Sequence, residues 1–389
     1  MDLDFSPQES AFRAEARAWL AAHVPRTPLR SLETREGFAE HREWERTLAA
    51  DGWSAVSWPR EYGGRGRSPL EWLIFEEEYH AAGAPARVAQ NGISLLAPTL
   101  FAHGTPEQRA RVLPPMAGGE VVWAQAWSEP EAGSDLASLK SVAVRTAGGW
   151  HVSGQKAWSS RAAFADRAFG LFRSGSGGPP HHGLTYVMFP LDARGVTVRP
   201  VGRLDGKPAF AELFLDEVFV PEADVVGEPG EGWRVAMSTA GNERGAALRS
   251  PGRFLAAAER LVALWRSAAD PADTALRDRV ADVVVRARAY QLRAYAEVAR
   301  LAEGGSTGAE ASLGKVFWSE LDLALHETAL DILGPYGELA DIAGEAPAGG
   351  AWADGYTFAL AGPLYAGTNE IQRDIVAERL LGLPRGRRR

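Results

Sequence analysis

The sequence predicts an α+β protein in which helices open and close the chain and a block of β-strands lies between them. Residues 1–118 carry apolar side chains at helical spacing, residues 119–230 hold short alternating runs between glycine and proline turns, and residues 231–389 return to helical spacing. This order keeps helices and strands apart, whereas an α/β fold would alternate them. We therefore expect an N-terminal helical domain, a middle β-sheet or barrel domain and a C-terminal helical bundle with these boundaries.

The N-terminal segment begins with a strong helix start. Ser6-Pro7-Gln8-Glu9 supplies an N-cap, a proline in the first turn and a glutamate at N3, the pattern of a capping box. An amphipathic stretch continues to about His23. A second helix is expected over residues 68–82, where residues 76–78 are all glutamate, and a turn-rich connection over residues 53–66 separates the two.

The middle segment contains the strand candidates. Residues 141–160 alternate between polar and apolar side chains around a Gly-Gly turn at 148–149, which predicts a hairpin. Further strands are expected over residues 183–191, 195–201 and 211–220.

The C-terminal segment is rich in alanine and leucine at helical spacing. Helices are expected over residues 253–267, 274–302, 308–334 and 366–381. The last of these follows a glycine-rich turn.

Composition limits the classes of function. A chain of 389 residues is too long for one hydrophobic core, and 46% apolar with 24% charged residues is typical of globular proteins. No apolar run is long enough to cross a membrane, and a net charge of −8 argues against nucleic acid or an anionic membrane as a partner. The lack of cysteine excludes disulfides and thiolate metal sites, and the histidines are scattered, so we expect no metal site. A chain without cysteine also fits a reducing compartment, so we expect a cytoplasmic protein.

Three stretches carry the chemical signal, although each also has a purely structural interpretation. Gln125–Asp135 (QAWSEPEAGSD) could be a polar turn, Gly154–Ser160 (GQKAWSS) a turn with a packed tryptophan, and Gly232–Ala246 (GWRVAMSTAGNERGA) a helix with a surface Glu-Arg pair. A dinucleotide-binding glycine fingerprint, a Walker loop, a G-x-S-x-G elbow and an H-E-x-x-H motif are all missing from the sequence.

Taken together, in this order and spacing, these stretches resemble the acyl-CoA dehydrogenase family over essentially the whole chain. WPREYGG at residues 58–64 and AGTNEIQRDIVAERLLGLPR at residues 366–385 extend the resemblance toward both ends. The resemblance implies an FAD-dependent enzyme that desaturates an acyl-CoA thioester between its α- and β-carbons. It also implies that the electrons pass to an electron-transfer flavoprotein.

The resemblance further implies which residues meet FAD, between the β domain and the C-terminal helices. Contacts to the flavin pyrimidine edge fall on Gln125, Ala126, Trp127 and Ser128, those to the ring and N5 on Trp158 and Ser160, and those to the adenosine side on Thr368 and Glu370. The types suit the task, because a flavin needs an apolar face and donors near N1, O2 and N5, where charge accumulates when hydride arrives. The family often has an amide where this chain has Glu370.

The catalytic base is displaced from its usual place. Many family members carry an acid where this chain has Ala366, whose backbone N–H can still donate to the thioester oxygen. Some branches instead place a glutamate before an arginine at the start of the first C-terminal-domain helix, which matches Glu243-Arg244. The resemblance thus implies Glu243 as base, with Arg244 and Ser134 binding the substrate. The alternative is that Glu243 is a solvated acid favoured by the dipole at a helix N-terminus.

Two other functions share this fold, and the assembly differs from the family pattern. Dioxygen could reoxidise the flavin, as in related oxidases and hydroxylases, or the chain could be a non-catalytic subunit. In the family, an R-x-x-F-G stretch and a glutamine before a Gly-Gly turn help to hold the FAD pyrophosphate of a neighbouring subunit. Residues 265–279 lack the first, and Asp331 and Pro335 stand at the places of the glutamine and a glycine. An aspartate would repel the pyrophosphate. We expect an oligomer, either a heteromer with a related subunit that supplies the arginine or a homo-oligomer that uses Arg266 or Arg277.

Overall fold

The computed structural model describes residues 4–175, 178–244, 249–305, 308–339 and 344–385, with the side chain of Arg244 left out. The chain divides into two compact units, each built from separate stretches of sequence. The helical unit comprises Met1–Val24, Ser68–Ala84 and Arg244–Arg389, and the sheet unit comprises Pro25–Arg67 and Pro85–Glu243.

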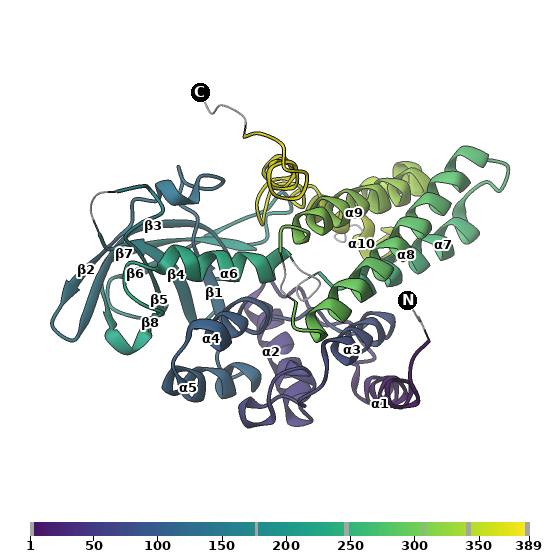
Figure 1. Cartoon of the computed structure of the whole chain (residues 1–389). Helices are drawn as coiled ribbons and strands as arrows, with labels where there is room; N and C mark the ends of the chain where they lie inside the picture. The colour runs from purple at the N-terminus through teal and green to yellow at the C-terminus, as the bar shows by residue number, and fades with distance from the viewer. Residues whose placement is uncertain (1–3, 176–177, 245–248, 306–307, 340–343, 386–389) are drawn as a thin grey trace. The chain divides into compact units, whose positions relative to one another are not determined.

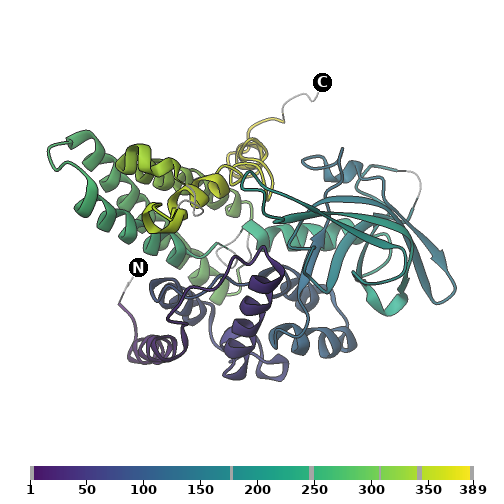
Figure 2. The ribbon, with the colours of Figure 1, turned by 180° about the vertical axis from the view of Figure 1, so that it is seen from behind.

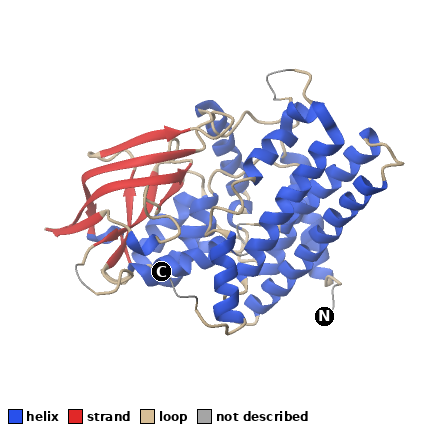
Figure 3. Cartoon of the chain, turned by 90° about the horizontal axis from the view of Figure 1, so that it is seen from above, coloured by secondary structure: helices blue, strands red, loops and turns tan. Residues whose placement is uncertain are grey.

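The sheet unit is built around one eight-stranded mixed sheet, drawn in red in Figure 3. Its order is β6-β7-β3-β2-β4-β5-β8, with β1 paired in parallel to β4. The strands are β1 (Trp123–Ala126), β2 (Val142–Thr146), β3 (Gly149–Ser160), β4 (Arg167–Arg173), β5 (Leu184–Pro190), β6 (Val196–Val201), β7 (Phe210–Pro221) and β8 (Val225–Val226). The expected hairpin is confirmed, because β2 and β3 pair antiparallel up to Thr146 and Gly149.

The strands of the sheet unit pack around an apolar core. Phe172, Val187, Phe189, Leu213 and Val218 are all fully buried in it. β5 is buried along almost its whole length, so it forms a continuous apolar run and lacks the alternation of a strand with one solvated face.

The helices of the sheet unit include the one that carries the candidate base. They are α2 (Arg35–Ala50), a π-helical turn (Asn91–Leu96), α4 (Ala97–His103), α5 (Pro106–Ala117) and α6 (Gly232–Arg244). Thr99 in α4 and Thr239 in α6 join their helices through hydroxyl groups 2.7 Å apart.

The helical unit packs long helices side by side. Its helices are α1 (Pro7–His23), α3 (Pro69–Ala81), α7 (Pro251–Ala268), α8 (Thr274–Ala302), α9 (Ala311–Leu333), α10 (Ala351–Ala359) and α11 (Asn369–Ile375). α7, α8 and α9 lie side by side (Figure 1), and the core between them contains Phe254, Leu261, Tyr290, Trp318 and Leu325. The C-terminal helices α10 and α11 pack against α9, in the yellow-green part of Figure 2.

The helix starts follow the sequence. Ser6 N donates to Glu9 Oε2 at 2.7 Å and Glu9 N donates to Ser6 Oγ at 3.2 Å, which confirms the capping box of α1. A second box, Ser68 with Glu71, starts α3 in the same way.

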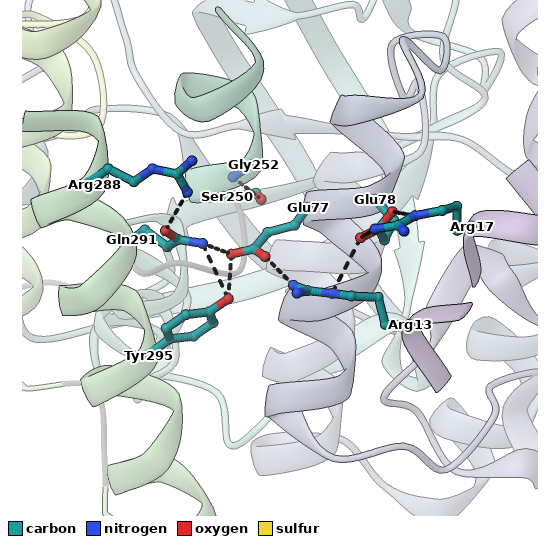
Figure 4. A network of polar contacts seen from close by, with 9 residues as sticks. All are labelled: Arg13, Arg17, Glu77, Glu78, Ser250, Gly252, Arg288, Gln291 and Tyr295. Atoms are coloured by element: carbon teal, nitrogen blue, oxygen red, sulfur yellow. Dashed lines mark hydrogen bonds and ion pairs between the residues drawn. The ribbon is translucent and has the colours of Figure 1, made fainter. Parts of the chain in front are cut away.

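Two of the glutamates of α3, Glu77 and Glu78, are buried polar partners, drawn in Figure 4, and do not form a solvated face. Glu77 accepts hydrogen bonds from Arg13 at 2.5 Å, from Gln291 at 2.6 Å and from Tyr295 at 2.7 Å. Burial, with the Glu77 carboxylate beside it, raises the pKa of the Tyr295 hydroxyl. Glu78 accepts from Arg17 at 2.8 Å, so both carboxylates tie α1 to α3.

Candidate active site

The end of β1 carries the first group of expected flavin contacts. Gln125 and Ala126 lie in β1 opposite Phe169 and Gly170 of β4, and Trp127 follows directly. The Trp127 ring meets the Tyr186 ring edge to face, with centroids 6.3 Å apart. The buried Nε2 of Gln125 has no hydrogen-bond partner among the described residues, so the chain leaves one donor unused here.

A β-bulge in β3 carries the second group. Lys156 pairs with Leu213 and Ser159 with Ala211, so two residues of β3 oppose one of β7. Trp158, at the bulge, has a left-handed backbone with φ 59° and a side chain that is 63% exposed. A bulky residue in this conformation is strained, and such strain gathers at functional sites.

The bulge brings the two groups together. Ala157 N donates to Ser128 O at 2.8 Å, so the backbone of β3 leaves β7 and bonds to the segment after β1. The exposed indole of Trp158 and the unused amide donor of Gln125 are the kinds of group a flavin needs, an apolar face and a directed donor. Ser160 closes β3 and is half-buried.

Glu243 lies near the C-terminal end of α6, so its expected place at a helix start is wrong. The carbonyl end of a helix dipole disfavours a negative charge, and the dipole therefore does not explain this acid. Thr239 precedes Glu243 by four residues and faces the same side of α6. Its hydroxyl lies 3.4 Å from the Tyr186 hydroxyl.

Tyr186 contacts both α6, through Thr239, and the residue that follows β1, Trp127. Burial is the main cause that raises the pKa of Tyr186, and the charge of Glu243 adds to the rise. The same tyrosine ring meets Trp127, so α6 and the end of β1 share one neighbourhood within the sheet unit. The side chain of Arg244 lies outside the described residues.

The turn before α11, in the helical unit, is held from several sides. Ala366 has a left-handed φ of 57°. Gln372, which is fully buried, donates from Nε2 to Ala366 O at 3.1 Å and to Gly367 O at 3.2 Å. Buried Lys315 donates to Pro363 O at 3.0 Å and to Asn369 Oδ1 at 2.7 Å.

Of the remaining expected contacts, Thr368 is half-buried, and Glu370 and Ser134 are exposed. Thr368 caps α11 by accepting from Ile371 N at 3.3 Å. Glu370 is exposed in the first turn, where backbone N–H donation and then the Thr368 hydroxyl lower the pKa of its carboxyl. Ser134 is exposed in the loop after β1.

Sequence reasoning did not assign Lys156, Glu129 or Gln372, although all are buried beside expected site residues. A signal existed for Lys156, since it is a charged residue at an inward position of an alternating strand.

Comparison with known families covers each segment of the chain. The N-terminal domain model of acyl-CoA dehydrogenases matches residues 6–120, the middle domain model residues 124–218 and the C-terminal domain model residues 230–381. The chain belongs to the acyl-CoA dehydrogenase family.

Named relatives and solved structures agree. Acyl-CoA dehydrogenase IpdE1 of Mycobacterium tuberculosis is 39% identical, with 96% of this chain and 97% of that protein covered. FadE26 of the same organism is 33% identical over the whole of both chains. The structure entitled Tcur3481-Tcur3483 steroid ACAD has a TM-score of 0.89 at 31% identity, covering 99% of this chain and 100% of that one. The ChsE4-ChsE5 complex of M. tuberculosis has a TM-score of 0.84 at 31% identity, with 99% and 100% covered.

The chain is therefore an FAD-dependent acyl-CoA dehydrogenase. Among the described helices, none is both long and apolar enough to cross a membrane. No three His, Asp or Glu side chains of the described residues gather as metal ligands.

Proposed function

We propose that Glu243 is the base that removes the α-proton of the acyl thioester. Thr239, one turn earlier on the same face of α6, lies with its hydroxyl 3.4 Å from that of Tyr186, whose ring meets Trp127, and this geometry carries the proposal. Among the described residues of α6, Glu243 is the only acid. The carboxylate takes the proton on an Oε atom, and the electrons of the broken C–H bond move toward the thioester carbonyl. FAD held by the residues named below would supply the acceptor for the hydride that leaves the β-carbon.

The Ala366 N–H donates to the thioester oxygen in this proposal. The left-handed turn is fixed through the carbonyls of Ala366 and Gly367 by Gln372, which supports a preorganised donor. Backbone donation does not depend on the side chain, so alanine can stand where other members have an acid.

The FAD contacts follow the two groups joined at the bulge. Gln125, Ala126, Trp127 and Ser128 take the pyrimidine edge, Trp158 packs on the ring, and Ser160 bonds near N5. Thr368 and Glu370 lie toward the adenosine. The strained, exposed Trp158 and the unused Gln125 donor support these roles.

The substrate is a CoA thioester, which Ser134 and Arg244 help to bind. A solved relative at 31% identity is entitled a steroid ACAD, which favours a steroid-derived acyl group. Electrons pass to an electron-transfer flavoprotein. We place the enzyme in the cytoplasm, because a chain without cysteine fits a reducing compartment. We also propose domain boundaries near residues 118 and 230.

The assembly is proposed to be a heteromer with a related dehydrogenase subunit. Asp331, at the place of a phosphate-binding glutamine, forms an ion pair with Arg279. Arg277 pairs with Asp278 at 3.2 Å, so an acid neighbours each of these arginines. Two solved relatives have two-component titles. Expression of the chain alone, with measured mass and flavin content, tests this. A stable homo-oligomer with one FAD per chain, active without a partner, would contradict it.

Glu243→Gln tests the base. The variant should bind FAD and acyl-CoA as the parent does, yet reduce its flavin about 10²–10⁴-fold more slowly in anaerobic mixing with an acyl-CoA panel. Glu231→Gln, which removes an exposed acid just before α6, is the matched control and should keep the parent rate. Parent-like flavin reduction by Glu243→Gln would refute the base assignment.

The same experiment separates the other functions. Rapid aerobic turnover without an added acceptor would favour an oxidase or hydroxylase. Absence of flavin reduction by any acyl-CoA, alone or with the partner, would favour a non-catalytic subunit.

A further inference from the structure

A buried ion pair lies beneath the bulge of β3. Lys156 is fully buried, and its Nζ lies 2.9 Å from Glu129 Oε1. The same nitrogen donates to Leu171 O at 2.8 Å and to Trp127 O at 3.4 Å. All three donors of the ammonium therefore have acceptors, one of them on the segment of expected flavin contacts.

Glu129 extends the network to a third segment. Its Oε2 accepts from Lys140 N at 2.6 Å and its Oε1 from Ser141 N at 2.9 Å. Burial raises the pKa of Glu129, but the Lys156 charge and these N–H groups outweigh it, so the pKa is lowered. The carboxylate thus stays charged against the ammonium.

The pair joins both groups of flavin contacts. Lys156 and Glu129 are 27 residues apart, and each lies two residues or fewer from a proposed contact, Trp158 in β3 and Ser128 in the segment after β1. The backbone bond from Ala157 N to Ser128 O lies directly beside the pair. A change in the distance between Nζ and the carboxylate would therefore shift one group against the other.

We propose that Lys156 and Glu129 are positioning residues that hold the two flavin-contacting segments in register. This rests on the proposed FAD contacts of those segments. Burying an ion pair gains little net stability over an apolar pair, because desolvation offsets the attraction. The hydrogen bonds from Nζ to the two backbone carbonyls do what an apolar pair cannot, since they fix where the strands meet.

The experiment separates positioning from stability with Lys156→Met, Glu129→Gln and the double variant. Lys156→Met leaves a buried carboxylate without its cation and should lower both stability and FAD affinity, the latter by about 10-fold or more. The double variant removes both charges and should recover most of the stability. It should not recover the FAD affinity or the visible circular dichroism of bound flavin, because the donors to Trp127 O and Leu171 O remain missing.

Asp224→Asn is the matched control. Asp224 is a buried carboxylate of the same unit that pairs with Arg111 of α5 at 2.5 Å and with Arg167, the first residue of β4, at 2.9 Å, so its ion pairs involve none of residues 125–129 or 156–160. It should lose stability while keeping the FAD dissociation constant and flavin spectrum. A double variant that regains parent FAD affinity, or an Asp224→Asn that loses as much affinity as Lys156→Met, would overturn the proposal.

Hydrogen exchange of the apoproteins gives a readout that does not need FAD. Amides of residues 127–129 and 157–160 should exchange faster in the double variant than in the parent and in Asp224→Asn. If the parent bound no FAD, the proposed contacts would fail, and this exchange difference would still decide the positioning. Equal exchange in the parent and the double variant would refute it.

Discussion

Gln372 offers a direct test of how the turn at Ala366 is held. Gln372→Met keeps the length of the side chain but removes the Nε2 donor that bonds two backbone carbonyls, at 3.1 and 3.2 Å. Each lost bond costs about 1 kcal/mol, and more where the carbonyl stays buried and unpaired, so we expect about 2–3 kcal/mol less stability. The measurement is the free energy of unfolding in urea.

The functional effect should exceed what stability alone explains. Complete loss of an oxyanion donor costs about 10²–10³-fold in kcat. Gln372→Met displaces the proposed Ala366 donor without removing it, so kcat should fall by roughly 10- to 100-fold. The assay is anaerobic flavin reduction by whichever acyl-CoA reduces the parent most rapidly.

Gln108 supplies the matched control. Its Nε2 also donates to two backbone carbonyls, Ala223 O at 3.0 Å and Val225 O at 2.6 Å, and it is buried in the sheet unit. Gln108 Oε1 also accepts from Thr105 N at 3.0 Å, so Gln108→Met should lose at least as much stability as Gln372→Met, with unchanged kcat. If both variants lose stability and Gln372→Met keeps the kcat of Gln108→Met, the turn does not depend on Gln372 for catalysis and the reasoning is wrong.

Three further outcomes are expected. Gly252→Ala should lower the free energy of unfolding by about 1–3 kcal/mol, because its Cβ would lie 2.6 Å from a backbone oxygen of α3. Gly314→Ala should lose less stability, because its Cβ meets only the end of an arginine side chain. Equal losses of the two variants in urea unfolding would contradict this prediction. Trp158→Gly should leave the apoprotein at least as stable, since glycine tolerates the left-handed φ of 59°, yet weaken FAD binding in a titration; unchanged affinity would contradict the stacking role. Burial lowers the pKa of Lys156 to about 8 from 10.5, so between these pH values the unfolded chain holds one more proton than the folded chain. The free energy of unfolding should therefore rise with pH there by up to about 1.4 kcal/mol per pH unit, relative to the Lys156→Met/Glu129→Gln double variant, and a falling difference would contradict it.

The sequence by itself determined the helices, most strands and the family. Short patterns predict features that join residues a few positions apart. Such features are the Ser6 capping box, the Gly148–Gly149 hairpin and the helical turns of α7 to α9. The candidate flavin stretches were recognisable because their order and spacing along the chain are themselves the signal.

Tertiary structure decided which side chains support those stretches. Lys156 meets Glu129 across 27 residues, and Glu77 meets Gln291 across 214, distances over which no local pattern constrains a partner. The left-handed backbone of Trp158 depends on a register shift between β3 and β7, which alternation within one strand does not encode. The end of α6 at which Glu243 lies was misjudged, because that helix begins at Gly232, and its contacts through Thr239 with α4 and β5 join residues far apart in the sequence.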